Sequence, residues 1–215
     1  MSDRFALYYA PARDSLLWQR AEDWLAQPDL QPISVSARRY GFHATIKAPM
    51  ALADGTDRAG LEMALADFAR THRPVALTGL AVTPIEGFLA LTTTPQPQAL
   101  TDFAATVVTA FERFRMPLEP AARARRLRAP LSARQIELVD EYGYPYVLEQ
   151  FQFHMTLTDR LEAPALTAMR ERAAGWFAEA LAQPIVLDRL VLFHEAEPGA
   201  AFRRLDDFVL KGSGS

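Results

Sequence analysis

One short phrase occurs twice in the chain, and it carries two residue types that can move protons and bind phosphate. The segment 42–46, Phe-His-Ala-Thr-Ile, returns in the second half as 153–157, Phe-His-Met-Thr-Leu. In an extended segment side chains alternate between two faces, so the His and Thr of each copy point the same way. The Phe and the aliphatic residue then point to the other side, toward a core. Two histidines beside one substrate supply a general acid and a general base near neutral pH.

The elements that must hold these motifs follow one order in both halves: motif strand, helix, strand, turn and strand. Apolar periodicity predicts helices that begin at Asp14 or Ser15, at Thr56 or Asp57, near 98, at Ser132 and near 164. Period-two runs predict strands over about 5–9, 40–47, 75–84, 87–93, 151–158, 185–195 and 201–210. Helices that alternate with hairpins indicate an α+β fold of two similar lobes, with antiparallel sheets that form a central cleft.

Both lobes are expected to belong to one domain over residues 1–211. The first lobe covers about 1–115 and the second about 116–211, a length that can bury a substantial core. The last residues, 212–215, are Gly and Ser only, and we interpret them as a flexible tail or an added linker.

A single His-x-Thr triplet indicates little, because such triplets arise by chance and most strand histidines are structural. The pair is more informative, since the repeated frame includes the preceding Phe and the following aliphatic residue. Two of the four histidines in the chain occupy this frame. We therefore interpret His43, Thr45, His154 and Thr156 as catalytic residues.

These two motifs, each followed by a helix and a hairpin, resemble the 2H phosphoesterase superfamily, which includes cyclic phosphodiesterases and RNA-end processing enzymes. The longer strings at 39–49 and 151–158 are similar to a bacterial branch of uncharacterised proteins encoded beside phosphonate-degradation genes. The resemblance covers residues 3–210. It implies a two-lobed, pseudo-symmetric 2H fold and a role in phosphonate metabolism, for example on a ribosyl cyclic phosphate.

The four side chains suit the opening of a cyclic phosphodiester. A neutral imidazole takes a proton from water while a protonated one gives a proton to the leaving oxygen, since the ordinary pKa of His is about 6.5. Thr45 and Thr156 supply hydroxyl donors for the phosphoryl oxygens. The near-symmetric repeat leaves open whether His43 or His154 is the base, and a bell-shaped pH profile is expected. We expect no metal and no cofactor, because two histidines and two hydroxyls make a poor metal site.

Two substrate-binding candidates continue the alternation of the motif strands. Lys47 is four residues after His43, so on a regular strand it faces the same side and can bind a second anionic group. A solvated lysine at a strand end is an equal alternative. Thr158 follows Thr156 by two residues and is expected to line the cleft as well.

Three further candidates, Arg38, Arg39 and Tyr40, precede the first motif on an expected loop rim, where substrate contact and simple solvation are equal alternatives. The arginines between 123 and 128 are interpreted as a solvated face rather than a nucleic-acid site. The tyrosines between 142 and 146 are interpreted as packing or turn residues, with an aromatic wall for a base or sugar as the alternative. His72 and His194 are interpreted as structural.

Composition restricts the partners. The net charge of the 215-residue chain is −3, so no global positive field holds nucleic acid, although a local arginine cluster can bind a small anion. There are no cysteines, which excludes disulfides and thiolate metal sites. No secretory leader or membrane span is apparent in the sequence, so we expect a cytoplasmic monomer.

The function expected from these observations is a metal-independent phosphodiesterase. Its substrate would be a small cyclic phosphate or a 2′,3′-cyclic or 2′-5′-linked nucleotide. One alternative is a module that binds a nucleotide or phosphonate without turnover. Another is RNA-end processing or ligation on short RNA, which the acidic balance disfavours.

Overall fold

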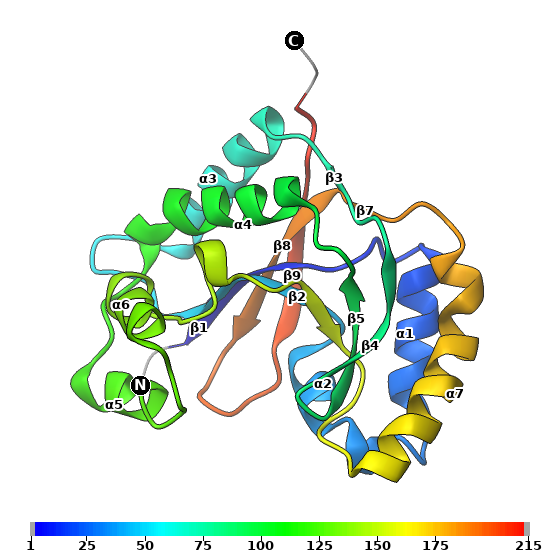
Figure 1. Cartoon of the computed structure of the whole chain (residues 1–215). Coiled ribbons are helices and arrows are strands. Elements are labelled where there is room, and N and C mark those ends of the chain that lie inside the picture. Colours follow the sequence, from blue (N-terminus) through cyan, green and yellow to red (C-terminus); the bar gives the residue numbers. More distant parts are fainter. Residues whose placement is uncertain (1–2, 213–215) are drawn as a thin grey trace.

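The computed structural model describes residues 3–212, and within that range seven strands form one antiparallel sheet in the order β4-β5-β6-β2-β1-β8-β9 (Figure 1). A second sheet in the same range pairs two short strands, β3 with β7. The strands are β1 (Arg4–Tyr9), β2 (Ala44–Met50), β3 (Val75–Ala76), β4 (Leu80–Ile85), β5 (Phe88–Thr93), β6 (His154–Thr156), β7 (Val186–Leu187), β8 (Arg189–Glu195) and β9 (Arg203–Val209).

The helices lie where apolar periodicity predicts them, with additions in the connections. They are α1 (Leu16–Ala26), α2 (Val35–Tyr40), α3 (Arg58–Thr71), α4 (Gln98–Ala110), α5 (Pro120–Arg126), α6 (Ala133–Tyr142) and α7 (Ala163–Leu181). The predicted caps Ser15, Asp57 and Ser132 each accept a hydrogen bond from a backbone N–H of the first turn. The α+β class expected from the sequence is therefore confirmed.

One added helix, α2, replaces the loop that we expected before the first motif. Its first turn is held by a distant residue, because Asp159 accepts hydrogen bonds from the backbone N–H groups of Val35 (2.8 Å) and Ser36 (3.1 Å). Such a tertiary cap leaves no local signal in the sequence. The chain then turns at Gly41, whose φ of 74° suits glycine, and enters β2 at Ala44.

The two halves of the chain share one sheet instead of forming a sheet each. The motif strand of the second half, β6, pairs with β5 of the first half on one side and with β2 on the other. The hairpin β8–β9 of the second half pairs with β1 of the first. The strands of the two halves are thus interleaved, which replaces the expected pair of facing sheets.

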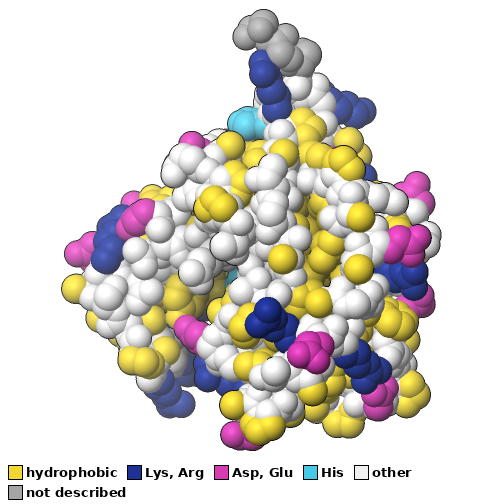
Figure 2. All heavy atoms as spheres, turned by 45° about the vertical axis from the view of Figure 1, so that its right-hand side comes forward, with side chains coloured by type: hydrophobic (Ala, Val, Ile, Leu, Met, Phe, Trp, Pro, Cys, Tyr) yellow, Lys and Arg dark blue, Asp and Glu magenta, His cyan; other side chains and the backbone are white. Residues whose placement is uncertain are grey.

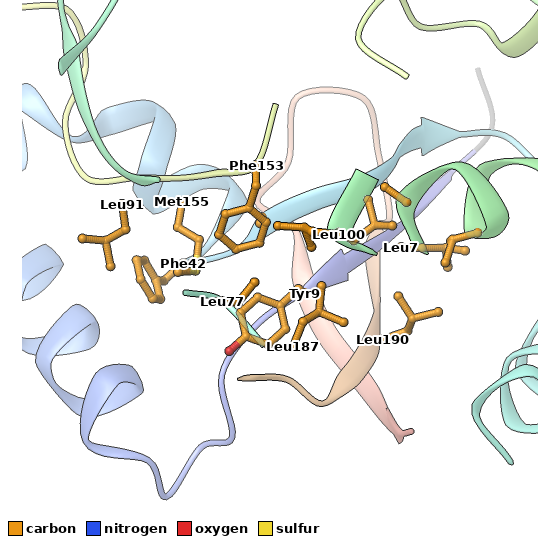
Figure 3. Close-up of a cluster of buried hydrophobic side chains, with 14 of the residues drawn as sticks. Leu7, Tyr9, Phe42, Leu77, Leu91, Leu100, Phe153, Met155, Leu187 and Leu190 are labelled. Atoms are coloured by element: carbon orange, nitrogen blue, oxygen red, sulfur yellow. The ribbon is translucent and has the colours of Figure 1, made fainter. Parts of the chain in front are cut away.

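The helices α1, α3, α4 and α7 pack their apolar sides on one face of this sheet. Figure 1 shows α1 and α7 side by side, with α7 packed on β4 and β5, while α4 crosses the central strand β2 and α3 packs on β8 and β9. The buried side chains of this core include Phe42, Phe153 and Met155 of the two motifs (Figure 3). The aromatic and aliphatic residues of the repeated phrase therefore point into the core, as the alternation predicts.

The opposite face of the sheet carries a smaller apolar cluster. Along β1, Leu7 and Tyr9 belong to the main core, whereas Ala6 and Tyr8 belong to the second cluster with Phe193. No helix within residues 3–212 is long and apolar enough to cross a membrane. Of the expected tail, Gly212 donates its N–H to the carbonyl of His72 at 2.9 Å, and 213–215 lie outside the described residues.

Burial of Phe42 under the helices predicts a large loss of stability on truncation. Phe42 is 0% exposed, so we expect Phe42→Ala to lower the free energy of unfolding by about 3–5 kcal/mol. Val35→Ala removes a side chain that is 60% exposed and should change it by less than about 0.5 kcal/mol. Urea unfolding followed by circular dichroism measures both, and equal stabilities of the two variants would contradict the packing described.

Candidate active site

The two motif strands are hydrogen-bonded neighbours, and their register brings the four motif residues together. Ala44 of β2 lies opposite Met155 of β6 in an antiparallel pair. In that register His43 lies across from Thr156, and Thr45 lies across from His154. Because Ala44 and Met155 point into the core, the histidines and threonines point to the opposite face.

All four residues line one pocket with a volume of about 300 Å³. In the space-filling view a small area of histidine is visible near the centre of the face, inside a hollow (Figure 2). The two motifs were expected on two lobes across a central cleft, and the structure instead places them side by side in one sheet, where they line one pocket. Their catalytic role is a proposal, which we develop below.

Both imidazoles are oriented in the same way by the backbone. Nδ1 of His43 lies 2.8 Å from the carbonyl oxygen of Gly41, and Nδ1 of His154 lies 3.0 Å from that of Gln152. A carbonyl oxygen can only accept, so in each ring Nδ1 carries the proton and donates it. In the neutral state this leaves Nε2 of each ring with a free lone pair. For His43 that atom lies 3.2 Å from the hydroxyl of Thr45, which donates to it.

His43 sits in an apolar setting that favours its neutral form. Its ring stacks on Tyr8, with 3.8 Å between the ring centroids and 23° between the planes. Burial lowers the pKa of His43 to about 4, against the opposing effect of the hydrogen bond to Gly41, and the charge of His154 lowers it further. His43 is therefore neutral at pH 7 when no ligand is bound.

Tyrosines and arginines from other elements build the remaining walls. Tyr40 comes from the end of α2, Tyr144 from the turn after α6, Arg4 from β1 and Arg126 from the end of α5. The lining consists of Arg4, Tyr8, Ser36, Ala37, Tyr40, His43, Thr45, Ala48, Pro49, Arg126, Tyr144, His154 and Thr156. Among these described residues there is no carboxylate, so the pocket is complementary to an anion.

A buried carboxylate behind the pocket fixes two of the nearby arginines. Glu195 is 0% exposed, and it accepts hydrogen bonds from Arg4 at 2.5 Å and from Arg39 at 2.7 Å. Burial alone would raise the pKa of Glu195, but hydrogen bonds from Arg4, the backbone N–H of Gly199 and Arg39 hold it below its usual value. Arg39 thus binds Glu195 and does not line the pocket, so the structure does not support substrate contact, one of the two alternatives for this residue.

The structure contradicts both alternatives for Lys47, which neither faces the same side as Thr45 nor lies in solvent. Thr45 pairs with Tyr8 and Lys47 with Leu7, and the register shifts between these pairs in a β-bulge. Tyr8 and Leu7 point to opposite faces, so Lys47 turns to the face of the main core. There it is 3% exposed, and its Nζ donates to Glu112 at 2.6 Å.

Two more candidates lie away from the pocket. Thr158 follows the end of β6 and is 1% exposed, and its hydroxyl accepts a hydrogen bond from the backbone N–H of Leu89 at 3.0 Å. This hydrogen bond attaches Thr158 to β5, and Thr158 does not line the pocket. Arg38 is exposed on α2 and is not among the pocket residues. Of the candidates outside the motifs, the structure brings only Tyr40 to the pocket.

Sequence reasoning did not select eight of the thirteen lining residues, and four of these eight are charged or aromatic. Arg126 belongs to the basic run interpreted as solvated and Tyr144 to the turn interpreted as packing, while Arg4 and Tyr8 carry no local signal. The alternative of an aromatic wall was the one pointer to Tyr144.

The other two histidines have structural contacts, as predicted. His194 pairs with Asp3 at 2.9 Å, and the ring of His72 stacks on that of Phe68 with 3.6 Å between the centroids. Within residues 3–212 no three His, Cys, Asp or Glu gather as metal ligands.

The antiparallel sheet is covered by helices on one face, and its other face carries the pocket lined by the two His-Thr pairs. This arrangement defines an α+β protein with a candidate anion-binding active site. The chain belongs to the family described as "Protein of unknown function (DUF1045)", whose model matches residues 45–203. The crystal structure of TT0787 of Thermus thermophilus shares this fold, with a TM-score of 0.52 and 14% identity, covering 98% of this chain and 100% of that one.

Two curated relatives are named ribose 1,5-bisphosphate phosphokinase PhnN. The protein from Janthinobacterium sp. (strain Marseille) is 35% identical over 233 aligned positions, which cover 98% of this chain and 51% of that protein. The protein from Laribacter hongkongensis (strain HLHK9) is 35% identical over 229 positions, covering 99% and 53%. The chain therefore spans about half the length of the curated relatives it matches.

The low pKa of His43 predicts a specific pH dependence of stability. In the unfolded chain the imidazole takes up its proton near pH 6.5, whereas in the folded chain it does so only near pH 4. Stability that His43 contributes at pH 7 is therefore lost as the pH falls from 6.5 through 4. Nitrogen-15 NMR titration, assigned with His43→Gln, should show His43 as the Nδ1–H tautomer down to pH 5. A midpoint at or above 6.5 would contradict this environment.

The buried position of Lys47 predicts a structural effect. Lys47→Met removes the partner of Glu112 but leaves Arg115 in contact with it at 2.6 Å, so we expect a loss of about 1–3 kcal/mol in the free energy of unfolding. Lys211→Met, at an exposed position, is the matched control and should lie within about 0.5 kcal/mol of wild type. Chemical denaturation measures both, and a Lys47→Met protein as stable as wild type would disprove the structural role.

Proposed function

We propose that the pocket hydrolyses a small cyclic phosphodiester without a metal ion, with His43 as general base and His154 as general acid. The observation that carries this proposal is the matched orientation of the two imidazoles. Each is held through Nδ1 by the carbonyl two residues before it, and both line one pocket. Two imidazoles that carry their proton on Nδ1 and line one pocket can present Nε2 to the same substrate, which supports paired proton transfer.

The proposed reaction opens the ring with one water molecule. His43 Nε2 accepts a proton from water as the water oxygen bonds to phosphorus. The bond between phosphorus and the leaving oxygen breaks, and the protonated His154 gives its proton to that oxygen. The product is a phosphate monoester with a free hydroxyl. Thr45 and Thr156 donate hydrogen bonds to the two non-bridging oxygens, where negative charge is stabilised.

The assignment of the base rests on the environment of His43. Its stacking on Tyr8 and its burial keep it neutral in the free protein, as a base must be. In the absence of substrate the Thr45 hydroxyl donates to its Nε2, and turning this hydroxyl to a phosphoryl oxygen frees the lone pair. A bound phosphate anion beside the ring raises its pKa toward the working pH, which strengthens it as a base.

The names of the curated relatives support a phosphorylated ribose as substrate. Those proteins are named as kinases of ribose 1,5-bisphosphate, and hydrolysis of a ribosyl 1,2-cyclic phosphate yields a ribose phosphate monoester. We therefore propose a ribosyl cyclic phosphate in phosphonate metabolism, with 2′,3′-cyclic or 2′-5′-linked nucleotides as the wider class. The kinase activity in their name is not transferred, because the chain spans about half their length.

Product analysis by phosphorus NMR tests the proposal. The protein with EDTA is incubated with 2′,3′-cyclic nucleotides, ribose 1,2-cyclic phosphate, ADP-ribose 1″,2″-cyclic phosphate and 2′-5′ oligoadenylate. We expect turnover of at least one compound, and a loss of at least about 100-fold in His43→Ala and in His154→Ala. His72→Ala is the matched control, because His72 stacks on Phe68 and does not line the pocket, and it should retain activity within about twofold.

Other results identify the alternatives. Thermal stabilisation by a panel member without any product would reject hydrolysis and favour a binding module. A requirement for longer RNA, with steep salt dependence, would favour RNA-end processing. Activity that disappears with EDTA and returns with a divalent ion would reject the metal-independent mechanism.

A further inference from the structure

A second and larger cavity adjoins the candidate active site. Its volume is about 780 Å³, and it shares Arg4, Ala48, Pro49 and Arg126 with the smaller pocket as a common wall. A ligand seated between the two histidines therefore has adjoining space for the part of it that does not react. The smaller pocket alone, at about 300 Å³, holds little more than a phosphorylated sugar.

The charges around this second cavity are mostly cationic. It is lined by Arg4, Arg115, Arg125 and Arg126, with Glu119 as the one carboxylate among the described lining residues. Arg4 pairs with Glu195, which also binds Arg39, and Arg115 pairs with Glu112, which also binds Lys47. Glu119 is exposed at the start of α5. Arg4 and Arg115 are thus held by carboxylates of the protein, whereas the ion pairs of the described residues include none for Arg125 or Arg126, at the end of α5.

Arg125 and Arg126 have no carboxylate partner within residues 3–212, whereas Arg123 of the same helix pairs with Asp140 at 2.5 Å. The Arg126 guanidinium lies over the ring of Tyr144, 5.5 Å from its centroid, at the junction of the two cavities. Burial lowers its pKa, and the charges of Arg4, Arg115 and Arg125 lower it further. Arg125, which is exposed, and Arg126, which is half-buried, both line the cavity, and guanidinium groups without a carboxylate partner are complementary to a phosphate.

We propose that the second cavity binds a second phosphate group of the substrate, held by Arg125 and Arg126, while the cyclic phosphate lies between His43 and His154. This inference deepens the proposed function and rests on it for the position of the reacting phosphate. The preferred substrate is then a sugar cyclic phosphate that also carries a phosphate monoester. The ribose in the relatives' name carries two phosphates, which supports the same ligand class.

Binding measured without turnover tests this site. We compare ribose 1,5-bisphosphate with ribose 1-phosphate by calorimetry at low salt. In the wild-type protein the bisphosphate should bind at least about tenfold more tightly, because a guanidinium adds charge-assisted hydrogen bonds to the second phosphate. Arg125→Ala combined with Arg126→Ala should reduce this ratio to near one. Arg125→Ala alone, which leaves the smaller pocket intact, should reduce it in part.

Arg128→Ala is the matched control, since Arg128 belongs to the same basic run but lines neither cavity. This variant should keep the wild-type preference for the bisphosphate over the monophosphate, and high salt should lower that preference in the wild-type protein. Equal binding of the two sugars by the wild-type protein, no binding of either, or a ratio retained in the double variant would overturn the proposal. Calorimetry measures binding of the second phosphate without turnover, whereas a failure of the proposed hydrolysis appears only in the NMR panel. The failure of one proposal is therefore distinguishable from the failure of the other.

Discussion

The pairing of β2 with β6 is the constraint on which the rest of the structure depends. It places Ala44 opposite Met155, and both side chains are completely buried under the helices. With these residues fixed in the core, the flanking His and Thr residues have to emerge on the other face, because side chains alternate along a strand. A slip of one residue would bury both imidazoles and expose the core, so hydrophobic burial itself maintains the geometry of the site.

The interleaved order of the strands explains how two distant segments become neighbours. Each motif strand is supported by partners from the other half, so neither half presents the site by itself. The sheet supplies the floor and part of the walls, and the other wall residues come from α2, the end of α5 and the turn after α6. Because these walls lie on short helices and connections, the ligand preference can change without altering the pair of motif strands.

Particular residues show how far local reasoning reaches. The helix caps at Ser15, Asp57 and Ser132 were predictable because a cap is a contact within one turn. The inward direction of Phe42 and Phe153 followed from alternation within a few residues. Lys47 was misplaced because a bulge against β1 interrupts that alternation, and Thr158 because β6 ends before it. Both events depend on a neighbouring strand, which the local pattern does not contain.

The sequence by itself determined the α+β class, most of the elements and the four motif residues, since these follow from periodicity, capping and a repeat of residue types. Only the tertiary structure decided that the two motifs lie on adjacent strands. It also decided which distant residues complete the pocket, namely Arg4, Tyr8, Arg126 and Tyr144. Arg39 and Lys47 bind carboxylates of the protein instead. The physical reason is that pairing and charge compensation join residues far apart in the chain, and no local pattern encodes their partners.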